Sequence, residues 1–367
     1  FTDDTDPHYF YFNPCAKDNT RTIPAGGTSE DAAVLCRNWA APPSPPPPSP
    51  PPSPPPDMPE AGYKRGLILS EEITTACLSH FDDRVHWVYD YSHRVPKQDT
   101  LNWINLQKAE FVPAIHGFRV DYAQQGPGGA TNECYLTQAM ATKAGGTKCA
   151  GNAQLSSQLG MLNTHLDTPM RYVFLANEPW RSAAHDLVDI DEYVEAFYYI
   201  TGAAFLNGLT IVSPTVRRGT TEFTGGAWWL ANFIAACDAD TTFGCDPDKI
   251  EVFDLHNYNC KASKWEDSGN FIEAMKGDLK SLLATTATTR SEEAWSDWVN
   301  ARPVWVSETS CNWDTNDDAL KPDNVESCLR ASGQTSASGY GDGSMAALDR
   351  VSGIDRWSWW TTQRSGF

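Results

Sequence analysis

Two glutamates, each at the end of an apolar run, are the strongest chemical signal in the sequence. The first run reads Arg171-Tyr-Val-Phe-Leu-Ala-Asn177-Glu178-Pro179, and the second, Arg302-Pro-Val-Trp-Val-Ser-Glu308, repeats the pattern. Apolar runs without alternation are typical of parallel strands covered on both faces, and proline favours an end to the first strand at Glu178. Two carboxyl groups at strand tips suit glycosidic bond cleavage. One protonates the leaving oxygen, and the other attacks the anomeric carbon or activates water.

The elements that would position these glutamates alternate between strand-like and helical patterns. Helices are expected over Asp191 to Leu206, where Asp189 could cap the start with Glu192 three residues on, and over Gly226 to Cys237 and Asn270 to Leu283. Eight strands are predicted, at Lys64–Leu69, Val85–Tyr91, Glu110–His116, Arg171–Asn177, Thr210–Pro214, Glu251–His256, Pro303–Ser307 and Asp355–Trp360.

Eight β/α units over roughly 300 residues predict an α/β fold of the (β/α)8 TIM-barrel type. In that fold the chemistry lies at the C-terminal ends of the strands, and Glu178 and Glu308 end the fourth and seventh strands. A doubly wound open sheet is the rival, but no glycine-rich phosphate loop follows the first predicted strand.

The sixth strand ends in a polar cluster, Asp254-Leu-His256-Asn-Tyr258. Alternation places these three polar side chains on one face, which is the barrel lumen if Leu255 points outward. His256 and Tyr258 could orient a carboxylate nucleophile or donate to a substrate hydroxyl. The competing interpretation is a hydrogen-bonded layer that fills the barrel.

Aromatic residues at other strand ends are candidate substrate contacts. Trp357 and Trp359 share a face of the eighth strand, where an inward ring could stack on a sugar. Core packing is the alternative for Trp360, which should point the other way. Tyr89 lies on the second strand and His116 ends the third.

The ordered motifs resemble the retaining TIM-barrel glycosidases and, among them, family 128 of the glycoside hydrolases, the endo-β-1,3-glucanases of fungi and bacteria. The resemblance runs from Tyr63 to the C-terminus. It is carried by Lys64-Arg-Gly-Leu67, Phe111-Val-Pro113, Asn177-Glu178-Pro179, Val212-Ser-Pro214, Asp254-Leu-His256-Asn-Tyr258, Trp305-Val-Ser-Glu308 and Trp357-Ser-Trp359-Trp360.

The resemblance implies that Glu178 is the acid/base, that Glu308 is the nucleophile and that the substrate is a β-1,3-glucan. Asn177 would reach the sugar 2-hydroxyl. The chain departs from the family pattern at Trp180, where aspartate is usual, and in cysteine-rich insertions at 126–151 and 311–343. Neither a metal nor an organic cofactor is expected.

Residues 41–59 form a Pro/Ser-rich run that predicts a polyproline II linker between a short cysteine-containing N-terminal segment, 1–40, and the barrel, 60–367. The run resembles hydroxyproline-rich wall glycoproteins of green algae and plants, which implies O-glycans on its prolines. A second hypothesis follows. The chain could be a non-catalytic structural or carbohydrate-binding glycoprotein of an extracellular matrix or filament, built on a glycosidase-like barrel.

A net charge of −19 argues against nucleic acid or an anionic membrane as partner, whereas a neutral polysaccharide carries no such penalty. Ten cysteines suggest an oxidising, extracellular or cell-wall location, and their spacings make no convincing zinc site. No run is apolar enough to span a bilayer. The short-range candidates for disulfides are Cys15–Cys36, Cys134–Cys149, Cys237–Cys245 and Cys311–Cys328, with Cys77 and Cys260 left over.

Overall fold

A computed structural model of the chain describes residues 64–69, 78–83, 85–115, 118–179, 189–217, 225–257, 268–309 and 353–359. The predicted N-terminal segment and Pro-rich linker lie outside these residues, as do the cysteines of the pairs Cys15–Cys36 and Cys311–Cys328, together with Cys77 and Cys260.

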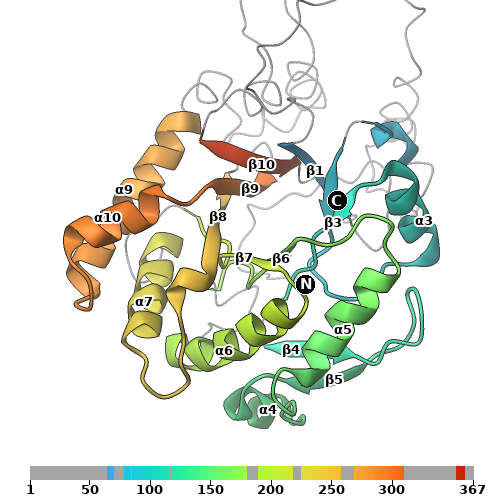
Figure 1. Ribbon diagram of the computed structural model, residues 1–367, viewed down its shortest axis with the longest axis horizontal. Coiled ribbons are helices and arrows are strands. Elements are labelled where there is room, and N and C mark those ends of the chain that lie inside the picture. Colours follow the sequence, from blue (N-terminus) through green and yellow to red (C-terminus); the bar gives the residue numbers. More distant parts are fainter. Residues whose placement is uncertain are drawn as a thin grey trace, which may run out of the picture.

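Eight parallel strands form the centre of the molecule and confirm the predicted barrel (Figure 1). Hydrogen-bonded neighbours follow the order β3-β2-β1-β10-β9-β8-β7-β6. The strands are β1 (Arg65–Ile68), β2 (Trp87–Tyr89), β3 (Glu110–Phe111), β6 (Tyr172–Phe174), β7 (Thr210–Val212), β8 (Ile250–Asn257), β9 (Val304–Thr309) and β10 (Ile354–Trp359).

The two edges of this sheet meet just beyond β3. The backbone N–H of Phe174 donates to the carbonyl of Pro113 at 2.8 Å, and the N–H of Ile115 donates to the carbonyl of Phe174 at 2.9 Å. These bonds and the parallel bridge between Ala114 and Phe174 close the sheet on itself, so the C-terminal ends of all eight strands share one rim.

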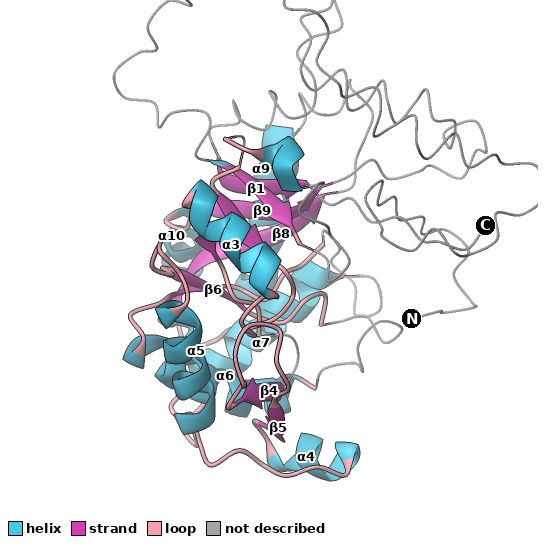
Figure 2. Ribbon diagram, turned by 90° about the vertical axis from the view of Figure 1, so that its right-hand side faces the viewer, coloured by secondary structure: helices cyan, strands magenta, loops and turns pink. Residues whose placement is uncertain are grey.

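Helices surround the strands, as Figures 1 and 2 show. They are η2 (Ser79–Phe81), α3 (Gln98–Gln107), α4 (Gln138–Ala144), α5 (Ala153–Thr164), α6 (Ile190–Leu206), α7 (Gly226–Ala239), η3 (Pro247–Lys249), α9 (Ser268–Thr286) and α10 (Glu292–Asn300). The predicted cap of α6 is confirmed, because the carboxylate of Asp189 accepts the N–H groups of Asp191 at 2.9 Å and Glu192 at 3.2 Å.

The strands separate two apolar cores. The larger one lies between the sheet and the helices, and it includes Trp357. The smaller one fills the barrel and consists of Ile68, Trp87, Tyr89, Val112, Ala114, Phe174, Val212, Val252 and Trp305. Gly66 makes room for this filling, since a Cβ at that position would lie 2.2 Å from the Trp87 ring.

A buried carboxylate closes the lower end of the barrel, where the strands begin. Glu110 accepts from the guanidinium of Arg171 at 2.6 Å and from that of Arg356 at 2.8 Å. Arg356 also lies over the ring of Trp305, with its guanidinium carbon 4.5 Å from the ring centroid. Such an arrangement at the N-terminal end of a barrel contributes to stability.

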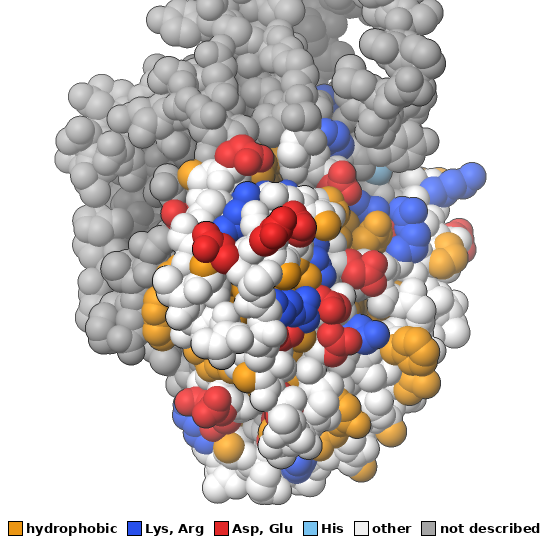
Figure 3. All heavy atoms as spheres, turned by 60° about the vertical axis from the view of Figure 1, so that its left-hand side comes forward, with side chains coloured by type: hydrophobic (Ala, Val, Ile, Leu, Met, Phe, Trp, Pro, Cys, Tyr) orange, Lys and Arg blue, Asp and Glu red, His pale blue; other side chains and the backbone are white. Residues whose placement is uncertain are grey.

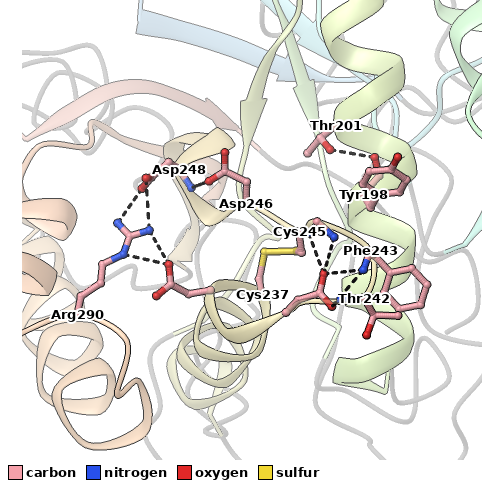
Figure 4. The surroundings of a disulfide bond; sticks show 12 residues. Tyr198, Thr201, Cys237, Thr242, Phe243, Cys245, Asp246, Asp248 and Arg290 are labelled. Carbon is pink, nitrogen blue, oxygen red and sulfur yellow. Dashed lines mark hydrogen bonds and ion pairs between the residues drawn. A yellow bond between two sulfur atoms is a disulfide. The ribbon is translucent and has the colours of Figure 1, made fainter.

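Two of the predicted disulfides are confirmed, Cys134–Cys149 and Cys237–Cys245. Figure 4 shows the second, which joins the end of α7 to the loop before β8. The same loop is braced by the Asp240 carboxylate, which accepts backbone N–H groups of residues 242–245, and by Arg290, whose guanidinium contacts Asp248 at 2.9 Å.

The insertion expected at 126–151 contains ordered structure. Strands β4 (Arg119–Tyr122) and β5 (Asn132–Tyr135) pair antiparallel, and Cys134 of β5 is bonded to Cys149 beyond α4. This hairpin follows the third barrel strand, so it adds to the rim that carries the C-terminal strand ends.

One face of the described surface mixes its charges. On the face that Figure 3 shows, acidic side chains are interspersed with basic and apolar ones instead of gathering in one patch. Among the described residues, no helix has the length and apolar character needed to cross a membrane.

Candidate active site

The two predicted glutamates converge at the rim of the barrel, at the ends of different strands. Glu178 follows β6 and is 4% exposed, and Glu308 lies near the end of β9 and is 3% exposed. His256 of β8 lies between them. Its Nδ1 is 2.8 Å from Glu178 Oε1 and its Nε2 is 3.2 Å from Glu308 Oε1. One imidazole ring therefore separates carboxyl groups that are 130 positions apart in the sequence.

Each glutamate has a further polar contact. Arg217, three residues beyond the predicted fifth strand, brings its Nε to 2.6 Å from Glu178 Oε1. The hydroxyl of Tyr91, just past β2, donates to Glu308 Oε1. Both contacts favour an ionised carboxylate.

The backbone is strained at two of these residues. Glu178 has a φ of 43° and Tyr91 a φ of 57°, in the left-handed region that side chains other than glycine rarely adopt. Strain of this kind costs of order 1–3 kcal/mol and persists only where the surrounding structure enforces it. Here it accompanies one of the two glutamates and the tyrosine that donates to the other.

The backbone before Glu308 is held from two sides. The carbonyl of Ser307 accepts the hydroxyl of Tyr89 at 3.1 Å, and it also accepts the hydroxyl of Ser358. The N–H of Ser307 donates to the carboxylate of Asp254 at 3.0 Å. The position of Glu308 is thus fixed by neighbours on β2, β8 and β10.

The other predicted site residues differ in their placement. Asn177 is half-buried beside Glu178, and its backbone forms a parallel bridge with Thr215, beyond the end of β7. Tyr89 lies one layer below the glutamates, in the barrel filling. His116 and Tyr258 lie outside the described residues, and so does the side chain of Trp359.

The prediction that Trp357 faces the lumen is wrong. Its ring is fully buried in the core between sheet and helices, and Arg356 is the residue of β10 that enters the barrel. The physical reason is that consecutive residues of a strand point to opposite faces: Arg356 pairs with the inward Trp305, and Trp357 pairs with the outward Val306.

The electrostatics centre on His256. Burial alone would lower its pKa, but the charges of Glu308, Glu178 and Asp254, with the hydrogen bond to Glu178, outweigh burial and raise the pKa above its usual value. His256 is thus favoured as an imidazolium between two carboxylates. Burial, with smaller contributions from Glu308 and Asp254, raises the pKa of Tyr89 well above its usual range, so its hydroxyl stays a donor.

A pH prediction follows from the raised pKa of His256. The stabilisation that the imidazolium provides is complete below about pH 6.5, its unfolded-state pKa, and is lost as pH rises through the folded-state pKa. Urea denaturation of wild type and His256→Gln across pH 5.5–9 should therefore show a stability difference that shrinks as pH rises. A difference that grows with pH would contradict the imidazolium between Glu178 and Glu308.

The described residues hold no group of His, Cys, Asp and Glu side chains that could bind a metal ion. What they hold is a carboxylate pair with a proton-bearing imidazole between its members. Such a pair can attack an electrophilic carbon from one side and exchange a proton with a leaving oxygen on the other, which is the chemistry of glycoside hydrolysis.

Comparison with known proteins shows a likeness of fold. No curated protein matches the chain. Two crystal structures of GH128 (subgroup II) endo-β-1,3-glucanases are similar in fold. The one from Pseudomonas viridiflava has 19% identity and a TM-score of 0.52 and covers 83% of this chain and 88% of its own. The one from Sorangium cellulosum has 18% identity and a TM-score of 0.50 and covers 82% of this chain and 89% of its own.

The family model described as "Glycosyl hydrolase catalytic core" matches residues 148–366, which is more than half of the chain. The matched region contains Glu178, Arg217, His256 and Glu308, the charged residues that meet at the rim. With these observations together, the chain belongs to the glycosyl hydrolase catalytic core family.

Proposed function

We propose that the protein is a retaining glycoside hydrolase that cleaves β-1,3-linked glucan in an extracellular matrix or cell wall. The observation that carries the proposal is the pair Glu178 and Glu308, brought to opposite sides of His256 at the rim of a closed barrel. The fold likeness to two endo-β-1,3-glucanases supports the choice of linkage.

In the first step an oxygen of Glu308 attacks the anomeric carbon while the bond from that carbon to the leaving oxygen breaks. Glu178 gives its proton to the leaving oxygen, and a covalent glycosyl–enzyme forms. In the second step Glu178, now ionised, takes a proton from water. The water oxygen attacks the same carbon and releases Glu308, so the configuration is retained. Asn177, beside Glu178, is assigned to the sugar 2-hydroxyl.

The surroundings suit these roles. Tyr91 and His256 favour the ionised form of Glu308 that a nucleophile needs. Arg217 and His256 favour ionised Glu178, which is the form required in the second step. For the first step Glu178 must carry a proton, and Nδ1 of His256, 2.8 Å from its Oε1, is close enough to deliver one.

The location and partners rest on other features. The two confirmed disulfides support an oxidising compartment. The Pro/Ser-rich run at 41–59 supports attachment to a wall or matrix, through O-glycans and neighbouring glycoproteins. The substrate polymer is itself uncharged, which suits a chain of net charge −19.

The decisive experiment incubates the full chain with linear β-1,3-glucan, β-1,4-glucan and xylan and measures the release of reducing ends. Release from β-1,3-glucan alone is expected, and proton NMR of the first product should show the β-anomer. The α-anomer as first product would indicate inversion, which needs carboxyl groups about 6.5–9.5 Å apart instead of about 5–5.5 Å. Binding of β-1,3-glucan without any release would favour the non-catalytic matrix glycoprotein.

A further inference from the structure

A second buried carboxylate lies directly below the glutamate pair. Asp254 of β8 is fully buried, two residues before His256 and on the same inward face. Leu255 between them packs in the outer core, as the alternation in the sequence predicts. The proposed mechanism gives Asp254 no proton to transfer and no bond to form.

The carboxylate of Asp254 accepts three hydrogen bonds from two neighbouring strands. Ser307 of β9 donates its N–H at 3.0 Å and its hydroxyl at 2.6 Å. Thr215, beyond the end of β7, donates its hydroxyl to Oδ2, the same oxygen that accepts the Ser307 hydroxyl. The N–H of Asp254 in turn donates to the hydroxyl of Ser213 at 2.9 Å.

Both partners lie next to a glutamate. Ser307 immediately precedes Glu308 in the chain. The carbonyl of Thr215 accepts the N–H of Glu178 at 3.2 Å, and the N–H of Thr215 donates to the carbonyl of Ala176 at 2.9 Å. One carboxylate therefore joins the backbone segments that carry the two catalytic groups.

Burying an ionised carboxylate at this depth costs free energy. Burial raises the pKa of Asp254 to about 6, against the opposing effects of His256, Ser307 and Thr215. A buried carboxylate is tolerated when donors satisfy it, whereas an apolar residue would fill the same space without that cost. An ionised carboxylate accepts only, so it is matched to the three donors that face it.

We propose that Asp254 is the positioning residue that sets the separation of Glu178 and Glu308, by tying Thr215 to Ser307 beneath them. This inference rests on the proposed function and adds to it a residue that touches neither the substrate nor the reacting atoms. A misplacement of about 1 Å in an active site can cost on the order of 100-fold in rate.

The first test replaces Asp254 with alanine and with asparagine. Asp254→Ala should lower kcat on β-1,3-glucan on the order of 100-fold and leave KM essentially unchanged. Asp254→Asn should recover much of the loss, because the amide oxygen accepts from Ser307 N–H and the amide nitrogen can donate to the two hydroxyls. Wild-type kcat in both variants would overturn the proposal, as would a loss confined to KM.

A double-mutant cycle separates positioning from general damage. If Asp254 acts through Ser307, then Ser307→Ala in the Asp254→Ala background should lower kcat little further. Thr215→Val, which replaces the hydroxyl with a methyl group, should likewise lower kcat little further in the Asp254→Ala background. If the losses of kcat in the single variants multiply fully in the double variants of both cycles, Asp254 does not act through Ser307 and Thr215.

Glu110→Gln is the matched control, because Glu110 is another buried carboxylate of the same barrel but lies at the opposite end. It should lower the denaturation midpoint and leave kcat near wild type.

Glu178→Gln and Glu308→Gln separate a failure of the proposed function from a failure of the positioning role of Asp254. If both are inactive and Asp254→Ala is not impaired, the function stands and the positioning role fails. If the glutamate variants are fully active, the function itself fails.

Discussion

Replacing Glu308 with glutamine is expected to reduce the hydrolysis of β-1,3-glucan by more than about 10⁴-fold. Acid–base contributions alone reach roughly 10²–10⁴-fold, and the loss of a covalent nucleophile should exceed them. Glutamine keeps the size of the side chain and can still accept from the hydroxyl of Tyr91, so the fold should be unaffected. The measurement is reducing-end release at saturating glucan, with circular dichroism as the check on folding.

Glu178→Gln supplies the comparison that separates the roles of the two glutamates. On glucan the loss should lie within about 10²–10⁴-fold, because the alkoxide leaves poorly without a proton. On a dinitrophenyl β-glycoside, whose phenolate leaves unaided, the first step should be nearly as fast as in wild type. Glu308→Gln should be inactive on both substrates. Equal losses on both substrates in the two variants would contradict the assigned roles, and unchanged turnover in either would end them.

The pair was predictable from the sequence because parallel strands of a barrel deliver their C-terminal ends to one rim. The end of an apolar run is visible in the sequence, most clearly where Pro179 follows Glu178. His256 was predictable for the same reason, since alternation along β8 puts Asp254 and His256 inside and Leu255 outside. The bridging position of His256 between the glutamates was not, because it depends on how far each strand extends above the rim.

Two residues that complete the site, Arg217 and Tyr91, were not among the predicted site residues. Arg217 lies three positions past the predicted strand Thr210–Pro214, and extending that strand to the bridge between Val216 and Leu255 would have brought it to the rim. Tyr91 lies two residues after Tyr89, so alternation along the predicted strand Val85–Tyr91 puts the two side chains on one face. Its contact with Glu308, however, accompanies a left-handed backbone that no sequence pattern there indicates.

The misplacement of Trp357 and the missed hairpin have different causes. Alternation indicates that Trp357 and Trp359 share a face but not which face enters the barrel, and in the structure Arg356 takes the inward place. The hairpin of β4 and β5 did leave a signal, since Gly126-Pro-Gly-Gly129 separates two short segments with strand formers. Because the eight predicted β/α units leave no place for two further strands, the sequence favours a loop insertion there.

The described barrel has layers with separate tasks. Glu110 and its two arginines close the lower end, aromatic rings fill the middle, and Asp254 with Ser307 forms a polar layer under the glutamates. Polar groups return above the aromatic layer, where the chemistry needs charge, and the buried carboxylates Glu110 and Asp254 each have donors that offset their desolvation. Changes in the middle layer should consequently affect stability, and changes in the polar layer should affect turnover.

Trp305→Ala should show this separation with the largest stability effect in the barrel. The ring of Trp305 is 1% exposed, and its centroid lies 4.7 Å from that of Tyr172 and 5.5 Å from those of Trp87 and Phe174. Truncation should lower the free energy of unfolding by about 3–5 kcal/mol, a large share of the ~5–15 kcal/mol typical of a domain.

Urea denaturation followed by fluorescence measures this loss, with Trp305→Phe expected to recover part of it and the half-buried Trp228→Ala as the control with a smaller effect. Below the transition, kcat per folded molecule should stay near wild type, because the neighbours of Trp305 lie beneath the layer of Asp254 and Ser307. A wild-type midpoint would contradict the packing of the middle layer. A large loss of kcat with Trp305→Ala would instead show that the aromatic rings of the middle layer also position Glu308. The packing of that layer would then affect turnover as well as stability.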